Sequence, residues 1–358
     1  SHLGSMMTRL RRQARNVIRD QLNATKDHAV IFTGSGATSG INRLVHLFSV
    51  PEMIEQGKSP VVLVGPYEHH SNILPWRESG AEVIEIPEAE SGGPCLISLR
   101  STLGSIKGRP IIGSFSAASN VTGILSNVIE VTRALKAAGA VVVWDYAGGA
   151  PYLKVDLCPA KDAMIDAVVL SPHKFVGGPQ ATGLLVLRND AVQTCLPTLP
   201  GGGTVCFVSS TAHDYSDNVE VREESGTPNV IGDLRAALCL LVKDAITQDY
   251  ITRRNRKNTG KALEAWGSNP NIELLGNLTC ERLPIFSFRV RDGKGGFVHQ
   301  QLITRLLSDR YGIQARGGCA CAGPYVHRLL GIDIDSSDRL RAEVLAGNEV
   351  EKPGSVRL

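Results

Sequence analysis

The stretch AVVLSPHK, residues 167–174, joins a short continuous apolar run to a lysine. An apolar run without polar alternation is typical of a strand buried on both faces. Small and polar residues then lead to Lys174. Because ligands of open α/β sheets bind outside the carboxyl ends of the strands, Lys174 is a candidate ligand-binding residue. The alternative for a single loop lysine is an ordinary solvated charge.

The same pattern recurs on both sides of this stretch. Further apolar runs occupy residues 61–64, 83–86, 110–115, 141–144 and 183–187. Helical patterns lie between these runs at residues 71–79, 97–105 and 127–138. Alternating strands and helices predict a mainly parallel α/β sheet connected by right-handed crossovers.

The pattern changes beyond residue 228. Long helices are expected at 231–246 and 249–266, followed by a strand at 284–291, a helix at 297–311 and a glycine-rich loop at 316–324. We predict a large α/β domain over residues 7–245 and a small C-terminal α+β domain over residues 246–358. Residues 1–6 are interpreted as a cloning remnant.

The composition excludes several classes of protein. With 42% hydrophobic and 20% charged residues, the chain is an ordinary globular protein rather than a disordered or fibrous one. A net charge of +3 gives no reason to expect nucleic-acid binding. No apolar stretch reaches about 18 residues, so no membrane span is expected. Eight cysteines are too few for a disulfide framework and are typical of a reducing compartment.

An arginine-rich, acid-poor segment precedes the first apolar run, and we interpret it as one solvated helix face. The expected location is cytoplasmic, and the alternative is that this segment is transit-like and the location mitochondrial. The arginines are Arg9, Arg11, Arg12, Arg15 and Arg19.

Two further motifs stand where a ligand site is expected. Residues 32–42, FTGSGATSGIN, place small and hydroxyl residues at the start of a helical pattern. Such a helix start binds phosphate well, although a simple turn with an N-cap is the alternative. Asp145 ends the apolar run 141–144, where it either caps the following turn or pairs with a cation.

Together these motifs fit one cofactor, pyridoxal 5′-phosphate (PLP). Its aldehyde needs a lysine such as Lys174, and its pyridinium nitrogen needs an acid such as Asp145. Its phosphate needs backbone and hydroxyl donors like those of residues 32–42. The sequence therefore predicts a PLP site at one edge of the sheet.

The order of several short motifs resembles one family, the class V aminotransferases of PLP fold type I, in particular their cysteine desulfurase and selenocysteine lyase branch. The resemblance implies a large mainly parallel α/β domain and a small C-terminal α+β domain. It also implies a chain that is short at both ends. The matching segments are residues 68–76, 119–123, 145, 171–174, 201–203, 224–229 and 316–323.

The resemblance also implies roles for individual residues. Lys174 is the Schiff-base lysine, Asp145 the partner of the ring nitrogen and His69 the imidazole stacked on the ring, unless the His69–His70 pair only caps a helix. Arg357 is the residue that binds the substrate carboxylate. Thr227 reaches the phosphate of a partner subunit, which requires a homodimer. Further cofactor contacts are expected from Ala37, Thr38, Asn120, Ser171 and His173, with Asn120 also near the substrate.

Cys321 stands where desulfurases carry the cysteine that accepts sulfur, with Cys319 as the alternative. The expected reaction converts L-cysteine to alanine and an enzyme persulfide, whose sulfur passes to an acceptor protein. The alternatives are a class V aminotransferase or β-lyase without a catalytic cysteine, and an inactive binding subunit. Gly148 replaces the glutamine usual in the family. Metal binding is not expected, because two cysteines and His327 are an incomplete ligand set.

Overall fold

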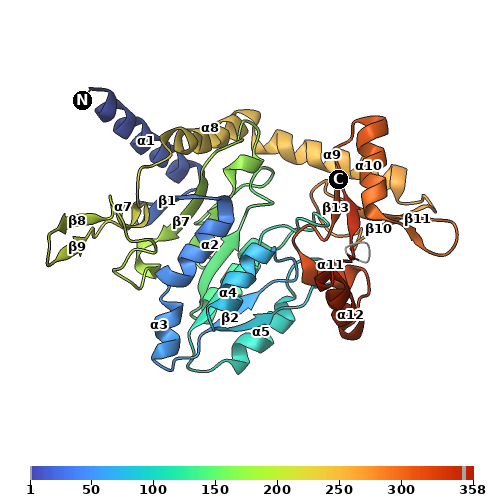
Figure 1. The fold of residues 1–358 in the computed structure, drawn as a ribbon, viewed down its shortest axis with the longest axis horizontal. Coiled ribbons are helices and arrows are strands. Elements are labelled where there is room, and N and C mark those ends of the chain that lie inside the picture. Colours follow the sequence, from blue (N-terminus) through green and yellow to red (C-terminus); the bar gives the residue numbers. More distant parts are fainter. Residues whose placement is uncertain (1, 349–351) are drawn as a thin grey trace.

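The computed structural model describes residues 2–348 and 352–358, and its central element is a seven-stranded sheet (Figure 1). Only β7 runs antiparallel to its neighbours, β1 and β6, and the other pairs are parallel. The predicted mainly parallel fold is therefore confirmed. In spatial order the strands are β1 (His28–Gly34), β7 (Gly183–Arg188), β6 (Ala167–Leu170), β5 (Val141–Asp145), β4 (Ile111–Ser116), β2 (Val61–Val64) and β3 (Glu82–Glu85).

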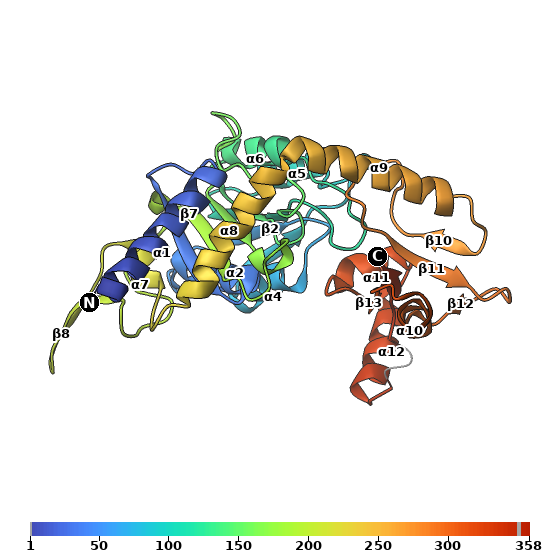
Figure 2. The same cartoon turned by 90° about the horizontal axis from the view of Figure 1, so that it is seen from above.

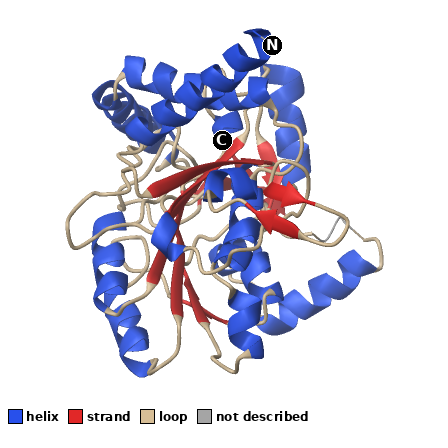
Figure 3. Ribbon diagram, turned by 90° about the vertical axis from the view of Figure 1, so that its left-hand side faces the viewer, coloured by secondary structure: helices blue, strands red, loops and turns tan. Residues whose placement is uncertain are grey.

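Helices cover both faces of this sheet (Figure 3). Successive side chains of a strand point to opposite faces, and in β2 Val61 and Leu63 enter one hydrophobic core while Val62 and Val64 enter the other. This double burial explains the continuous apolar runs. One face carries α1 (His2–Gln21), α5 (Leu96–Ser105), α6 (Val128–Ala137) and α8 (Val230–Ile246); the other carries α2 (Gly36–Leu47), α3 (Val50–Glu55) and α4 (Leu74–Glu78).

A second, smaller sheet lies beyond α9 (Gln248–Trp266), which leads away from the large sheet (Figure 2). All its pairs are antiparallel. We propose the boundary between the two parts near residue 245, where α8 ends. The strands are β10 (Ile272–Leu274), β11 (Ser287–Arg291), β12 (Phe297–Val298), β13 (Arg316–Gly318) and β14 (Ser355–Arg357), with helices α10 (Gln300–Tyr311), α11 (Gly323–Leu329) and α12 (Ile334–Leu345).

Some elements differ from the expectation. The helix predicted at 71–79 is divided into η1 (His70–Asn72) and α4, whose first turn contains Pro75, a residue suited to a helix start. β1 and the hairpin of β8 (Val205–Val208) and β9 (His213–Tyr215) were not predicted. Further short elements are α7 (Val219–Glu223), η2 (Pro172–Lys174) and η3 (Asn189–Ala191). Among the described residues, no helix has both the length and the apolar character required to cross a bilayer.

The arginines of α1 are not one solvated face, so that prediction is wrong. Three of them pair with acids that lie some two hundred residues away, around α7 and the start of α8. The sequence pattern of α1 alone does not show these acids. The pairs are Arg11 with Glu224 and Asp233, Arg15 with Glu220 and Glu224, and Arg19 with Glu220.

Replacing Arg15 with alanine is expected to lower the free energy of unfolding by about 2 kcal/mol, because it removes one of the two guanidinium groups that hold the poorly exposed Glu224 carboxylate. The side chains of Arg15 and Glu224 are only 11% and 8% exposed. Chemical denaturation measures the change. The matched control is Arg12→Ala on the exposed side of the same helix, expected within about 0.5 kcal/mol of the parent protein. Equal effects of the two variants would contradict the prediction.

Candidate active site

A cavity of about 240 Å³ lies at the carboxyl ends of the parallel strands. Ser116 ends β4, Asp145 ends β5 and Ser171 directly follows β6. This is the edge at which α/β sheets bind ligands. Most residues predicted for the site meet in this pocket: Ala37, Thr38, His69, Asn120, Asp145, Ser171, His173 and Lys174.

Helix α2 begins at one end of the pocket. The side chain of its N-cap residue, Ser35, makes no capping hydrogen bond. The N–H of Ala37 donates to the Ser171 hydroxyl at 3.0 Å, and the Thr38 and Ser71 hydroxyl oxygens are 2.7 Å apart. Since a helix N-terminus carries partial positive charge, its N–H groups and these hydroxyls form an arrangement suited to a phosphate.

The backbone at the start of α2 approaches its neighbours closely. Gly36 has a φ of +65°. A Cβ atom there would lie 2.8 Å from His173 Cε1 and 2.9 Å from Ser171 Oγ. Only glycine fits this position, so the sequence motif serves a close approach as well as a turn.

Lys174 and Asp145 provide opposite charges in the same pocket. Lys174 ends the short helix η2 directly after β6, and its side chain is open to the cavity. Burial by the pocket walls lowers the pKa of Lys174, and the Asp145 carboxylate opposes this shift. Burial raises the pKa of Asp145, which accepts a hydrogen bond from the Ala147 N–H at 2.7 Å. This bond is the capping interaction that was the alternative for Asp145, and the same carboxyl group also lines the pocket.

His69 both caps a turn and lines the pocket. Its Nδ1 accepts a hydrogen bond from the Ser71 N–H at 3.1 Å, so the capping interpretation holds for this nitrogen. The accepting Nδ1 is unprotonated, which places the proton of the neutral ring on Nε2. Burial, followed by the charge of Lys174, lowers the pKa of His69 to about 4.

We expect the His69 imidazole to remain neutral until the pH falls to about 4. Between this value and the ordinary 6.5, the unfolded chain binds a proton that the folded chain does not. The free energy of unfolding contributed by His69 therefore rises with pH across this window. NMR of nitrogen-labelled histidine measures the titration, and His69→Asn identifies the signal. A midpoint near 6.5 would contradict the account.

Asn120 and Arg357 connect the pocket to the small sheet. The Asn120 side-chain N–H donates to the Ala320 carbonyl oxygen at 2.8 Å, while its buried Oδ1 has no protein partner. Arg357 in β14 donates to the Asn120 backbone oxygen at 2.9 Å and pairs in register with Arg316 of β13. An unpartnered buried oxygen beside the pocket is a position for a ligand donor.

The two candidate cysteines differ in how their sulfur atoms are hydrogen-bonded. The Arg316 guanidinium donates to Cys321 Sγ at 3.1 Å, so a cation lies beside this sulfur, as is typical of reactive cysteines. Cys319 Sγ instead donates to the Pro353 carbonyl oxygen at 2.9 Å, which requires the thiol form. Burial also raises the pKa of Cys319. Of the two, Cys321 has the environment of a nucleophile.

Three predicted residues, Thr227, Arg357 and Cys321, lie outside the set that lines the cavity. Thr227 is exposed in the loop after α7, Arg357 contacts the backbone of the lining residue Asn120, and Cys321 contacts the lining residue Arg316. Sequence reasoning did not assign Arg316, Ser71 or Ser116 to the pocket, although all three line it. A cation five residues before a candidate thiol was the available signal for Arg316. Within the described residues no cluster of three or more metal-ligating side chains is present.

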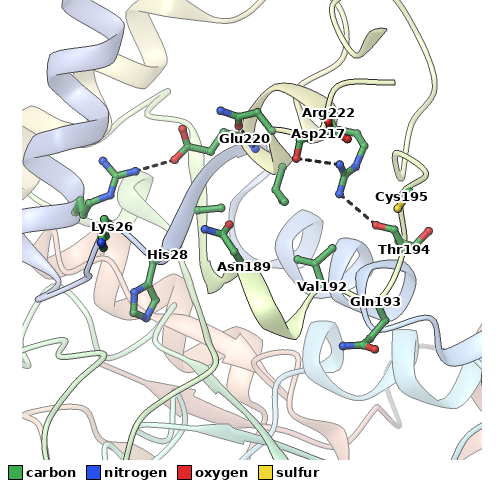
Figure 4. Close-up of a pocket in the computed structure, with 14 residues that line it drawn as sticks. Lys26, His28, Asn189, Val192, Gln193, Thr194, Cys195, Asp217, Glu220 and Arg222 are labelled. Carbon is green, nitrogen blue, oxygen red and sulfur yellow. Dashed lines mark hydrogen bonds and ion pairs between the residues drawn. The ribbon is translucent and has the colours of Figure 1, made fainter. Parts of the chain in front are cut away.

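A larger cavity, of about 570 Å³, lies at the opposite edge of the sheet, where β1 begins at His28 (Figure 4). Two of its charged side chains, Glu220 and Arg222, hold other parts of the chain together. Glu220 pairs with Arg19, and Arg222 donates to backbone oxygens of Thr194 and Asp217. Size alone therefore does not identify the reactive pocket.

Comparison with known proteins shows the family of the chain. The Aminotransferase class-V family model matches residues 1–345. A probable cysteine desulfurase of Pyrococcus abyssi is 28% identical over 341 residues, covering 91% of this chain and 78% of the relative. A cysteine desulfurase of Pectobacterium atrosepticum is 30% identical over 333 residues, covering 90% of this chain and 75% of the relative.

Solved structures show the same fold. A cysteine desulfurase from Escherichia coli has a TM-score of 0.78 at 25% identity, covering 99% of this chain and 79% of that chain. Another from Thermococcus onnurineus has a TM-score of 0.76 at 24% identity, covering 99% and 80%.

The mainly parallel sheet, with a lysine, an acid and an imidazole in the pocket at its carboxyl edge, defines a PLP-dependent enzyme of fold type I. The chain belongs to the aminotransferase class-V family. The family predicted from the order of the sequence motifs is thus confirmed.

Proposed function

We propose that the protein is a cysteine desulfurase that transfers the sulfur of L-cysteine to Cys321 and releases alanine. The observation that carries this proposal is the hydrogen bond from Arg316 to Cys321 Sγ, because Arg316 also lines the pocket of Lys174 and Asp145. Relatives named as cysteine desulfurases at 28–30% identity support it. Amino transfer requires no such thiol, so the contact favours desulfuration over the aminotransferase alternative.

The residues present fit PLP as the cofactor. Lys174 would hold the aldehyde, and Asp145 would accept from the ring nitrogen, whose positive charge would offset the burial of the carboxyl group. The unpartnered Asn120 Oδ1 offers an acceptor to the cofactor or substrate. The phosphate would bind at the start of α2, with Thr38, Ser171 and His173 beside it. Gly148 lines the pocket without a side chain, and a Cβ there would have only ordinary contacts.

When bound, PLP supplies the electron sink for negative charge at the substrate Cα. Lys174, with its lowered pKa, would move the proton at this carbon. Arg357 would bind the substrate carboxylate. The Cys321 thiolate would attack the substrate sulfur, the bond from sulfur to Cβ would break, and the carbon would take a proton. One cysteine and one thiol thus give one alanine and one persulfide without an external oxidant.

The proposal includes a homodimer, a sulfur-acceptor protein and a cytoplasmic location. Thr227 is exposed, and Phe207 and Val208 of the nearby β8–β9 hairpin are 56% and 62% exposed, a surface suited to a second subunit. Three of the α1 arginines that suggested a transit segment hold acids of the fold instead.

The test is incubation of the PLP-loaded protein with L-cysteine and a thiol reductant, which releases the persulfide sulfur as sulfide. Equal amounts of alanine and sulfide are expected. A parallel assay supplies 2-oxo acids as amino-group acceptors. Amino transfer without sulfide release would overturn the proposal and establish an aminotransferase.

A further inference from the structure

Three consecutive side chains, those of Glu68, His69 and His70, reach three different parts of the molecule. His69 lines the pocket, as described above. Glu68 is directed into the large sheet, and His70 is directed to the loop that carries Cys321. Each position in this short segment therefore serves a separate contact.

Glu68 fixes the segment to the sheet. Its Oε1 accepts from the backbone N–H groups of Gly65 and Ser116 at 3.1 and 2.8 Å. Its Oε2 accepts from the Asn72 side chain at 2.5 Å and from the Ser116 hydroxyl at 2.6 Å. Glu68 is 3% exposed, and four donors satisfy its carboxyl group, so the segment is rigidly positioned.

His70 contacts the cysteine loop at two points, the Cys321 carbonyl oxygen and the Gly323 amide. Its backbone N–H donates to the Cys321 carbonyl oxygen at 2.8 Å. Its imidazole Nε2 accepts from the Gly323 N–H at 3.0 Å. The loop is thus bound to the same segment that places His69 in the pocket.

The cysteine loop has a conformation that requires such support. Ala320 and Cys321 have φ angles of +49° and +57°, in the left-handed region that residues with a Cβ seldom adopt. Strained backbone persists only where surrounding contacts hold it. On the other side of the loop, the Asn120 side chain donates to the Ala320 carbonyl oxygen.

We propose that His70 is a positioning residue, which holds the cysteine loop against the rigid segment so that the Cys321 thiol faces the substrate. This inference rests on the proposed function, because it assigns His70 to the sulfur-accepting step. His70 is not among the residues that line the pocket. Its Nε2 acts as an acceptor for the loop alone.

The test compares His70→Ala with His70→Gln, which keeps an acceptor near the position of Nε2, in the PLP-loaded protein. In His70→Ala the Gly323 amide is expected to exchange hydrogen about 3- to 10-fold faster, the effect of losing one neutral hydrogen bond. Alkylation of Cys321 by iodoacetamide, followed by peptide mapping, should accelerate to a similar extent. We expect kcat for desulfuration to fall about 10- to 100-fold through misplacement of the thiol, with KM for cysteine nearly unchanged. His70→Gln should restore all three values most of the way.

The matched control is Arg328→Ala. Arg328 of α11 donates to the Pro66 carbonyl oxygen and pairs with Glu85, so it joins the same two parts of the chain without touching the cysteine loop. The Arg328→Ala variant should leave the rate of hydrogen exchange at the Gly323 amide and the kcat for desulfuration near the parent values. Equal effects of Arg328→Ala and His70→Ala would mean general loosening and overturn the proposal.

Two outcomes separate failure of this inference from failure of the proposed function. Unchanged Gly323 exchange and Cys321 alkylation in His70→Ala would overturn the role of His70, even if Cys321 accepts sulfur. Full desulfuration by Cys321→Ala would overturn the proposed function, whatever the exchange data show.

Discussion

Lys174→Ala is expected to remove the visible absorption of lysine-bound cofactor and to lower activity about a thousandfold. Two roles disappear together, because the same amine would hold the aldehyde and move the proton at the substrate Cα. The pocket lowers the pKa of this amine, so a larger fraction is uncharged at neutral pH. Absorption spectra and initial rates with L-cysteine measure the two effects.

Lys243 provides a matched control for the loss of a buried lysine. Burial lowers its pKa to about 8, but its ammonium group donates to the backbone oxygens of Ala150 and Leu153 outside the pocket. Lys243→Ala should keep the cofactor band and lose stability instead. If Lys174→Ala retained the band of lysine-bound cofactor, another lysine would have to hold the aldehyde and the site assignment would be wrong.

Cys321→Ala is expected to lower sulfide release at least about a hundredfold while the cofactor band stays unchanged, since only the sulfur acceptor is lost. Cys319→Ala should retain most of the activity, because Cys319 donates to Pro353 and burial keeps its thiol protonated. The two cysteines are two residues apart, so this pair of variants controls for loop damage. Parallel sulfide assays and spectra measure the outcome. The reverse ranking would identify Cys319 as the acceptor.

The sequence predicted most strands of the large sheet, although not β1, because most of them are covered on both faces. Continuous apolar runs then mark the strands, as at Val61–Val64 and Ala167–Leu170. An apolar run does not show whether its strand runs parallel or antiparallel to the neighbouring strands. An antiparallel strand covered on both sides, such as β7, has the same pattern as its parallel neighbours, and its reversal is a property of the connections.

The candidate site was predictable where it depends on strand ends. Lys174 and Asp145 follow adjacent parallel strands, so their proximity follows from the topology. Contacts that depend on loop conformation were not predictable. The pairing of Arg316 with Cys321 and the contact of His70 with Gly323 require the folded loop after β13, and the second contact joins residues far apart in sequence.

The ion pairs of the α1 arginines were also not predictable, because their acidic partners lie far away in the sequence. A basic, acid-poor helix has the pattern of a solvated face, yet Glu220, Glu224 and Asp233 approach it from a distant part of the chain. The ion pairs between these acids and the α1 arginines hold the segment that leads to Thr227 against α1. A charge pattern within one helix therefore does not determine its exposure.

The most direct test of the central claim is mass spectrometry of the PLP-loaded protein after brief exposure to L-cysteine without reductant. Peptides are alkylated and mapped to find where sulfur has been added. The account predicts one extra sulfur atom on Cys321, none on Cys319, and alanine in equal amount. Alanine formed with no added sulfur on Cys321, or sulfur placed on another cysteine, would contradict it.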